Sequence, residues 1–270
     1  MPRPHRLRRR LIIGLAVVVV LAIAGPFIFI HLIEGTAAPK LALPGTSKKP
    51  VGTTSATSSN IDGIWVVGAG SVAGYRVQEV LLGQHTTAVG RTSKISGSLT
   101  IKSGAVTAAH FVVVMASVES DQSQRNAQFD GHIMDVAAYP DATLVLTGPI
   151  EFGSTPASGQ VVHVSASGEL TMHGVTHKLS VKLSAERVGD QIDVLADSTI
   201  LFADWNIQNP SIGGFVTTAN SGTLEVLLHL TRGSTSSSVT TTTLGTTGGS
   251  PAPVTVPATT LAPLSVPSST

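Results

Sequence analysis

Hydrophobic and polar residues alternate with a period of two through the middle of the chain. In residues 178–183, leucine and valine alternate with lysine and serine, which is typical of a strand with one wet face. Residues 161–172 precede it as a second β run. The break between the two runs is His173-Gly174, where glycine can take a positive φ at no steric cost. This stretch predicts a β-hairpin.

Similar runs of β character fill residues 61–232, separated by Gly, Pro, Asp and Asn. We count nine or ten, which include Ile64–Val67, Val72–Val80, Ser98–Lys102, Val106–Val118, Ala142–Thr147, Val161–Met172, Lys178–Glu186, Gln191–Leu201 and Thr223–Thr231. No helix-length apolar period separates successive runs, which argues against a parallel α/β sheet. We therefore expect an all-β fold, either an antiparallel barrel or a sandwich.

Residues 119–140 break this β rhythm. Strong helix formers occur in residues 122–129, and Ser120 and Asp121 before them can cap the free N–H groups of a first turn. We predict one short helix followed by a loop. An insertion of this kind commonly covers an open end of a barrel.

The run Val106–Val118 is apolar on both faces. Phe111, Val113 and Met115 lie on one face, and Val112, Val114 and Ala116 lie on the other. A strand that is apolar on both faces needs cover on both. A ligand inside and the 122–129 helix outside would supply it, whereas ordinary core packing or a homodimer contact is the alternative.

The N-terminal residues indicate a membrane segment. Residues 1–10 contain five arginines and no acid, and residues 11–33 form a 23-residue apolar run. An α-helix needs about 20 apolar residues to span a bilayer, and an arginine cluster stays in the cytoplasm. We expect residues 1–34 to be an uncleaved signal anchor, a single transmembrane helix that leaves the rest of the chain outside the cell membrane. A cleaved signal peptide is the alternative, although its apolar region is usually about 7–15 residues.

Composition divides the remainder into one domain and two flanks. Residues 35–60 are rich in Thr, Ser, Ala, Gly and Pro and predict a flexible linker, and residues 233–270 predict a disordered Ser/Thr/Pro-rich tail. The domain between them, residues 61–232, carries nine Lys and Arg against fifteen Asp and Glu, a net charge of −6. It lacks the basic face that nucleic acids require, so we expect no nucleic-acid partner. The absence of cysteine excludes disulfides and thiol chemistry.

No pattern in the chain indicates catalysis or a metal. His173 and His177 are four apart, but they flank a hairpin turn and lack the His-Glu-x-x-His pattern, so we expect exposed turn residues. There is no Gly-x-Ser-x-Gly elbow and no Gly-rich phosphate loop before a helix. We predict a non-catalytic protein without a metal or cofactor.

Four short motifs occur in order along the globular block. They are Trp65 followed by Ser71, Tyr75 and Val77; Ser117-Val118 with Arg125-Asn126-Ala127-Gln128-Phe129 and Tyr139-Pro140; Gly168-Glu169-Leu170-Thr171-Met172-His173-Gly174-Val175-Thr176-His177-Lys178; and Ala203-Asp204-Trp205-Asn206. Together they resemble the YceI-like polyisoprenoid-binding family over residues 63–232. The chain departs from the family pattern at four positions: Asn126 stands for Asp, Gln128 for His, Ala203 for Arg, and Glu79 for a His of the first strand.

The resemblance implies an eight-stranded, lipocalin-like antiparallel barrel with one helix against it, whose apolar interior holds an isoprenoid chain. A closed barrel of about eight strands is just wide enough inside for side chains or one slender ligand. The ligand-binding residues that we expect are Tyr75, Val77, Phe111, Val113, Met115, Arg125, Asn126 and Tyr139. Arg125 would meet a phosphate or quinone oxygen, unless it pairs with Asp121 or Asp130 instead. The four departures leave the head group open.

The sequence therefore favours a membrane-anchored, extracytoplasmic protein that binds or carries an isoprenoid lipid of the quinone or prenyl phosphate type. The alternative is a non-catalytic surface module whose barrel is filled with side chains. Whether the interior is hollow separates the two.

Overall fold

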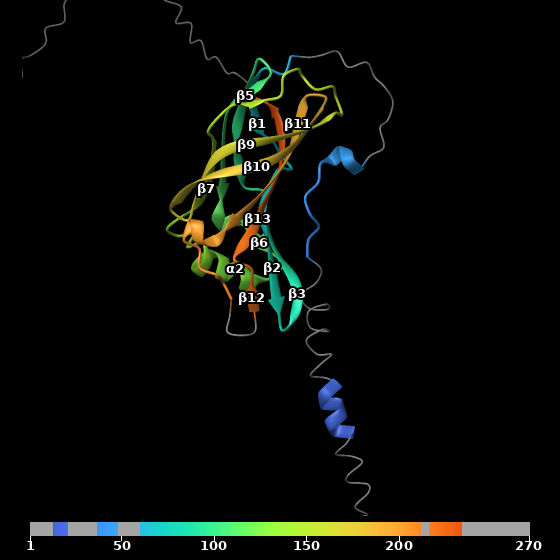
Figure 1. Ribbon diagram of the computed structural model, residues 1–270, viewed down its shortest axis with the longest axis vertical. Helices are drawn as coiled ribbons and strands as arrows, with labels where there is room; N and C mark the ends of the chain where they lie inside the picture. The colour runs from blue at the N-terminus through green and yellow to red at the C-terminus, as the bar shows by residue number, and fades with distance from the viewer. Residues whose placement is uncertain (1–12, 21–36, 48–59, 212–215, 234–270) are drawn as a thin grey trace, which may run out of the picture. The chain divides into compact units, whose positions relative to one another are not determined.

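The computed structural model describes residues 13–20, 37–47, 60–211 and 216–233 (Figure 1). Residues 13–20 are helical, and the rest of the expected 11–33 span lies outside the described residues, as do residues 48–59 of the expected linker and nearly all of the expected tail. Within the described ranges, no helix has the length and apolar character needed to cross a membrane.

Eight antiparallel strands form a closed barrel. In order around the ring they are β1 (Gly63–Val67), β4 (Ile95–Lys102), β5 (Ala105–Val114), β7 (Asp141–Leu146), β9 (Val161–Met172), β10 (Val175–Val188), β11 (Gln191–Leu201) and β13 (Ser221–Arg232). The ring closes because β13 pairs with β1, Trp65 opposite Arg232. The expected all-β, eight-stranded antiparallel barrel is confirmed.

A further hairpin lengthens the barrel at one end. Strands β2 (Val72–Leu81) and β3 (Gln84–Thr92) pair with each other, and β2 also pairs with the first half of β13. We did not predict β3, because its first residues are all polar and show no alternation. Three two- or three-residue strands were also not predicted: β6 (Glu119–Ser120), β8 (Ile150–Glu151) and β12 (Val216–Thr218).

The predicted central hairpin is present as β9 and β10. Its register runs from Val175 opposite Met172 to Glu186 opposite Val161. The turn residues His173 and Gly174 have φ values of 50° and 73°, the conformation that a tight two-residue hairpin turn requires.

The predicted short helix is present, but its position and its cap differ from our expectation. Helix α2 (Ser123–Gln128) continues into a π-helical turn, η3 (Phe129–Ile133), at the end of the barrel where β2, β3 and β12 lie (Figure 1). It does not shield the outer face of β5, where Val114 stays 43 % exposed. Gln122 occupies the N-cap without a side-chain hydrogen bond, so the predicted capping by Ser120 and Asp121 was wrong. The Ser120 hydroxyl instead lies 2.7 Å from Asn126 Oδ1.

Each end of the barrel is packed around a buried tryptophan. Trp65 is 1 % exposed, and its indole N–H donates to the Ile61 carbonyl at 2.8 Å. Trp205, in the 3-10 turn η4 (Phe202–Trp205), is 2 % exposed and donates to the Leu170 carbonyl at 3.3 Å. Buried indole N–H groups usually find an acceptor, and these two fix loops against the barrel ends.

Residues 37–47, which we had assigned to the flexible linker, lie against the outer wall of the barrel. Arg76 donates to the Ala38 carbonyl at 2.8 Å, and Arg91 donates to the Pro39 carbonyl. Both arginines also bond the buried carboxylate of Glu225, at 2.8 and 3.3 Å. Further along, Leu43 is 3 % exposed. These residues form a strap across the barrel wall.

A substitution at Gly45 can test how closely this strap packs against the barrel wall. A Cβ added at Gly45 would lie 2.1 Å from Oε2 of the buried Glu186 side chain, so a larger residue requires either that side chain or the strap to move. We expect Gly45→Val to detach the strap without unfolding the barrel, which limited proteolysis detects as faster cleavage within residues 37–47 at an unchanged melting temperature. Ala42→Val, at an exposed strap position, is the control. Equal cleavage of the two variants would contradict the close docking.

Candidate functional site

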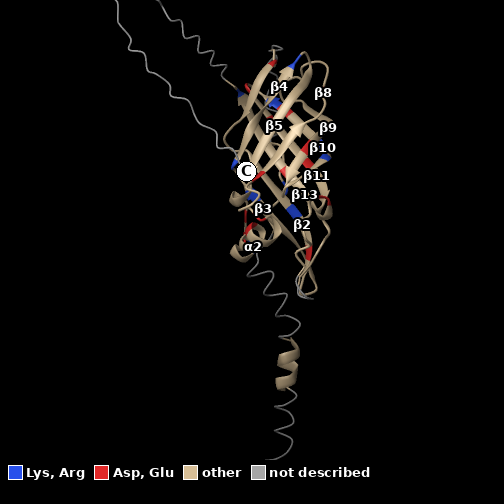
Figure 2. Cartoon of the chain, turned by 90° about the vertical axis from the view of Figure 1, so that its left-hand side faces the viewer, with Lys and Arg blue, Asp and Glu red and all other residues tan. Residues whose placement is uncertain are grey.

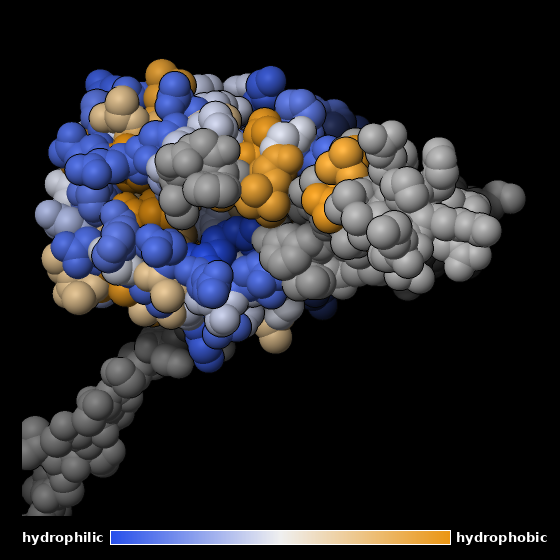
Figure 3. All heavy atoms as spheres, turned by 90° about the horizontal axis from the view of Figure 1, so that it is seen from below, coloured by the Kyte–Doolittle hydropathy of each residue, from blue (hydrophilic) through white to orange (hydrophobic). Residues whose placement is uncertain are grey.

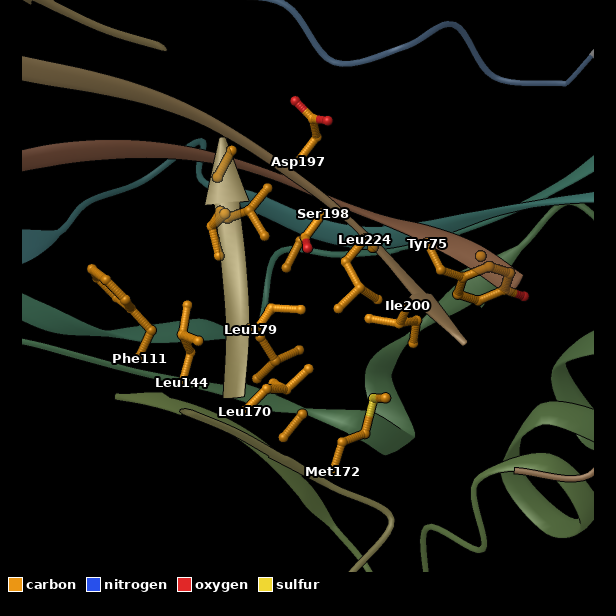
Figure 4. Close-up of a pocket in the computed structure, with 18 of the residues that line it drawn as sticks. Tyr75, Phe111, Leu144, Leu170, Met172, Leu179, Asp197, Ser198, Ile200 and Leu224 are labelled. Carbon is orange, nitrogen blue, oxygen red and sulfur yellow. The ribbon is translucent and has the colours of Figure 1, made fainter. Parts of the chain in front are cut away.

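The interior of the barrel is hollow. A cavity of about 870 Å³ is lined by side chains from the barrel strands, from α2 and η3, and from the loop after η4. In the close-up, Leu144, Leu170, Leu179, Ile200 and Leu224 surround the same space (Figure 4). This volume lies within the range of small-molecule binding sites, about 300–1,000 Å³.

Small residues at inward positions keep this space open. Ala166 and Gly168 of β9, Ala196 of β11 and Gly222 of β13 all line the cavity. Because successive side chains in a strand point to opposite faces, each such position leaves the interior wall without a large side chain. The larger aliphatic residues between them give the wall its apolar character.

Few polar groups in the middle of the cavity wall lack a hydrogen-bond partner. Ser198 is buried and lines the cavity, but its hydroxyl donates to the Ser180 carbonyl at 2.9 Å. The neighbouring Asp197 points away from the apolar side chains (Figure 4). A ligand in this region would meet hydrocarbon, which suits an apolar chain.

Charged groups gather where α2 meets β2. Arg125 bonds Glu79 of β2 at 3.2 Å and Asp121 at 2.5 Å. The Arg125 and Glu79 side chains are mostly buried, whereas that of Asp121 is 49 % exposed. Of the two partners that we considered for Arg125, the structure shows Asp121, and it adds Glu79. Elsewhere, charges of both signs are scattered over the outer wall (Figure 2).

Tyr75 lies beside this ionic group and also lines the cavity. Its ring fits over Gly90, where a Cβ would come within 2.3 Å of the ring, and it stacks on Phe129 with centroids 5.3 Å apart. Burial raises the pKa of the Tyr75 hydroxyl to about 12; Arg125 opposes this shift, and the carboxylates of Glu79, Asp121 and Asp130 add to it. Tyr75 is therefore a neutral hydrogen-bond donor at physiological pH.

The structure brings six of the eight sequence-predicted site residues together. The cavity is lined by Tyr75, Val77, Phe111, Val113, Met115 and Arg125. The other two do not line it. Asn126 accepts hydrogen bonds from the Ser120 backbone N–H at 2.8 Å. Tyr139 is 37 % exposed, with its ring edge-on to His173 at 4.9 Å.

The side chains of the two hairpin histidines both contact Trp205. Nδ1 of His173 lies 2.9 Å from the Trp205 carbonyl, and this side chain is half-buried rather than exposed as we expected. His177 is exposed, and its ring is edge-on to Trp205. Over the described residues, no group of three or more His, Asp or Glu side chains is placed to hold a metal ion.

Several lining residues were not among our predicted site residues. Alternation along β9 and β10 points to Leu170 and Leu179, and it would have identified them. Phe129 and Met134 also line the cavity, but they lie in and after a π-helical turn, where no simple period marks the inward positions. Seen from the α2 end, polar side chains dominate, and apolar ones show between them (Figure 3).

The fold and the cavity define a closed antiparallel barrel with a hollow apolar interior, large enough for one slender ligand. The chain belongs to the YceI-like family: the model of the YceI-like domain matches residues 65–230, more than half of the chain. This confirms the resemblance found in the sequence motifs. None of the curated proteins compared with the chain matches it significantly.

Solved structures resemble this chain to different degrees. A polyisoprenoid binding domain from Saccharophagus degradans has a TM-score of 0.51 at 18 % identity and covers 64 % of this chain and 99 % of its own, which shows the common fold. Burkholderia cenocepacia BcnA is 21 % identical over 61 % of this chain and 98 % of its own, with a TM-score of 0.45. The Campylobacter jejuni YCEI protein is 12 % identical over 71 % and 98 %, with a TM-score of 0.40.

The buried environment of Tyr75 predicts a specific pH dependence. Because the folded-state pKa of Tyr75 is about 12 against an ordinary tyrosine value of 10.0, the folded state retains this proton when the unfolded state has lost it. The contribution of this proton to the unfolding free energy is complete below pH 10 and is lost as pH rises towards 12; two pKa units correspond to about 3 kcal/mol.

We expect the unfolding free energy of the wild type to fall over this interval by more than that of Tyr75→Phe. In Tyr139→Phe, which leaves Tyr75 as the one remaining tyrosine, phenolate absorbance should titrate with a midpoint about 12. A midpoint near 10 would show that Tyr75 is solvated.

Proposed function

We propose that this protein is a membrane-anchored, extracytoplasmic carrier of a polyisoprenoid lipid. The chain of the lipid occupies the barrel cavity, and its head group lies beside Tyr75 and Arg125. The observation that carries this proposal is the hollow apolar interior of about 870 Å³, in a member of the YceI-like family.

The energetics of such a cavity favour a long apolar ligand. Each CH2 group transferred from water contributes about 0.8 kcal/mol, so one isoprene unit adds a few kcal/mol before ordering costs. A chain of several units can thus bind tightly through hydrocarbon contact alone. The polar groups at the α2 end then select and orient the head group.

The N-terminal run of residues 11–33 supports membrane anchoring, because its length and its preceding arginines suit a single span. An anchored barrel would work at the outer face of the membrane, where it can exchange lipid with the bilayer. The proposed protein binds and carries rather than catalyses.

A surface module with a filled core, our second hypothesis, is disfavoured by the same cavity. Ordinary protein interiors are packed to the density of organic crystals, with few voids larger than a water molecule. A cavity of this size costs stability unless a ligand fills it. We therefore keep lipid binding as the proposed function.

Filling part of the cavity should weaken lipid binding. Ala166 is buried and lines the cavity, whereas its neighbour Ser165 is exposed on the outer face. We expect Ala166→Trp to weaken geranylgeraniol binding, measured by calorimetry, by roughly tenfold or more, because displacing two methylene groups removes about 1.6 kcal/mol.

Ser165→Trp is the matched control and should bind as the wild type does. The melting temperature of Ala166→Trp should stay near that of the wild type, because the indole enters empty space. Unchanged binding in a folded Ala166→Trp protein would place the lipid outside the barrel.

A further inference from the structure

The α2 end of the cavity carries more negative than positive groups. Arg125 faces the carboxylates of Glu79 and Asp121, and Asp130 on η3 adds a third. All four act electrostatically on the Tyr75 hydroxyl. His132 is a further titratable side chain that lines this end. Two carboxylates therefore contact the single guanidinium of Arg125, and a third, Asp130, acts on the same tyrosine.

This balance is unfavourable for an anionic head group. Phosphate sites in proteins gather cationic side chains or free backbone N–H groups, which form charge-assisted hydrogen bonds with the oxygens. Here the guanidinium already bonds two carboxylates, at 3.2 and 2.5 Å. A phosphate at Arg125 would share the guanidinium with both carboxylates and would lie beside them, and the carboxylate of Glu79 is largely buried.

The same groups suit an uncharged head group. The Tyr75 hydroxyl makes no hydrogen bond within the described part of the chain and can donate to a carbonyl or hydroxyl oxygen. One carboxylate oxygen of Asp130 on η3 is buried and has no hydrogen-bond partner among the described residues. The amides of Gln124 and Gln128 also line this end, and they can donate and accept.

We infer that the head group of the bound lipid is uncharged, of the isoprenoid alcohol or quinone type, and that prenyl phosphates are rejected. This inference rests on the proposed lipid-binding function and narrows its ligand class. The charge of the head group distinguishes the two ligand classes, because the apolar wall would accept the same prenyl chain with either head group. The acids exclude the phosphate, and the Tyr75 hydroxyl together with the neighbouring polar groups binds the neutral group.

A matched pair of ligands tests this inference directly. Geranylgeraniol and geranylgeranyl phosphate share one prenyl chain and differ only in the head group. We expect the alcohol to bind the full-length protein about tenfold more tightly in calorimetric titrations at fixed ionic strength. One uncompensated unit charge about 10 Å away gives a factor of this size at an effective dielectric constant of about 20.

Three variants identify the carboxylates as the cause. Glu79→Gln removes a buried charge, and Asp121→Asn removes a half-exposed one with less risk to folding. Both should reduce the preference for the alcohol several-fold, measured as the ratio of the two dissociation constants. Glu151→Gln, at an exposed position on β8, removes the same charge away from this site and should leave the ratio unchanged.

The possible outcomes separate the two proposals. If the phosphate binds the wild type as tightly as the alcohol, the head-group inference is wrong and the lipid-binding function stands. An equal change of ratio in Glu151→Gln would also overturn the inference, because net charge rather than this site would then set the preference. If neither ligand binds the folded protein, the proposed function itself fails.

Discussion

Closure of the eight-stranded ring is the constraint on which the rest of this structure depends. Once β13 pairs with β1, every second residue of each strand must face a common interior, whose width is set by the number of strands. Alanine and glycine at several of these positions leave that interior hollow, and leucine, valine and isoleucine make it apolar. The ion pairs of Arg125 with Glu79 and Asp121 lie at the α2 end of the barrel, where the regular strands that form this wall end.

The regular part of this architecture could be predicted because a period of two records which side chains face inward. Residues 178–183 alternate cleanly, and the β9–β10 hairpin follows from that alternation and from Gly174. Strand β3 escaped prediction because its first residues are polar on both faces. The strap formed by residues 37–47 could not be predicted, because the hydrogen bonds from Arg76 and Arg91 go to its backbone carbonyls, which carry no sequence signal.

The residues of the candidate site also fall into those that alternation could predict and those that it could not. Phe111 and Val113 could be placed from the alternation of one strand, and the structure shows them on the cavity wall. Met115 also lines the cavity, but strand β5 ends at Val114, so Met115 lies in the 3-10 turn that follows rather than in the predicted strand. Asn126 and Tyr139 were chosen from motif resemblance, and local contacts hold both of them away from the cavity. The partners of Arg125 could not be derived from the sequence alone, since Glu79 is 46 positions away and meets it only when α2 covers the barrel end. Long-range ion pairs of this kind depend on the fold, and the charge of the head-group region depends on them.

The proposed function requires that the hollow interior holds an isoprenoid chain. The most direct test is native mass spectrometry of the full-length protein purified from a bacterial host, whose membranes supply isoprenoid lipids. Organic extraction then identifies any bound lipid. We expect a stoichiometric co-purifying isoprenoid with an uncharged head group, and much less of it in Ala166→Trp. A protein that is folded, free of lipid, and still free of lipid after incubation with quinones and prenols would contradict it.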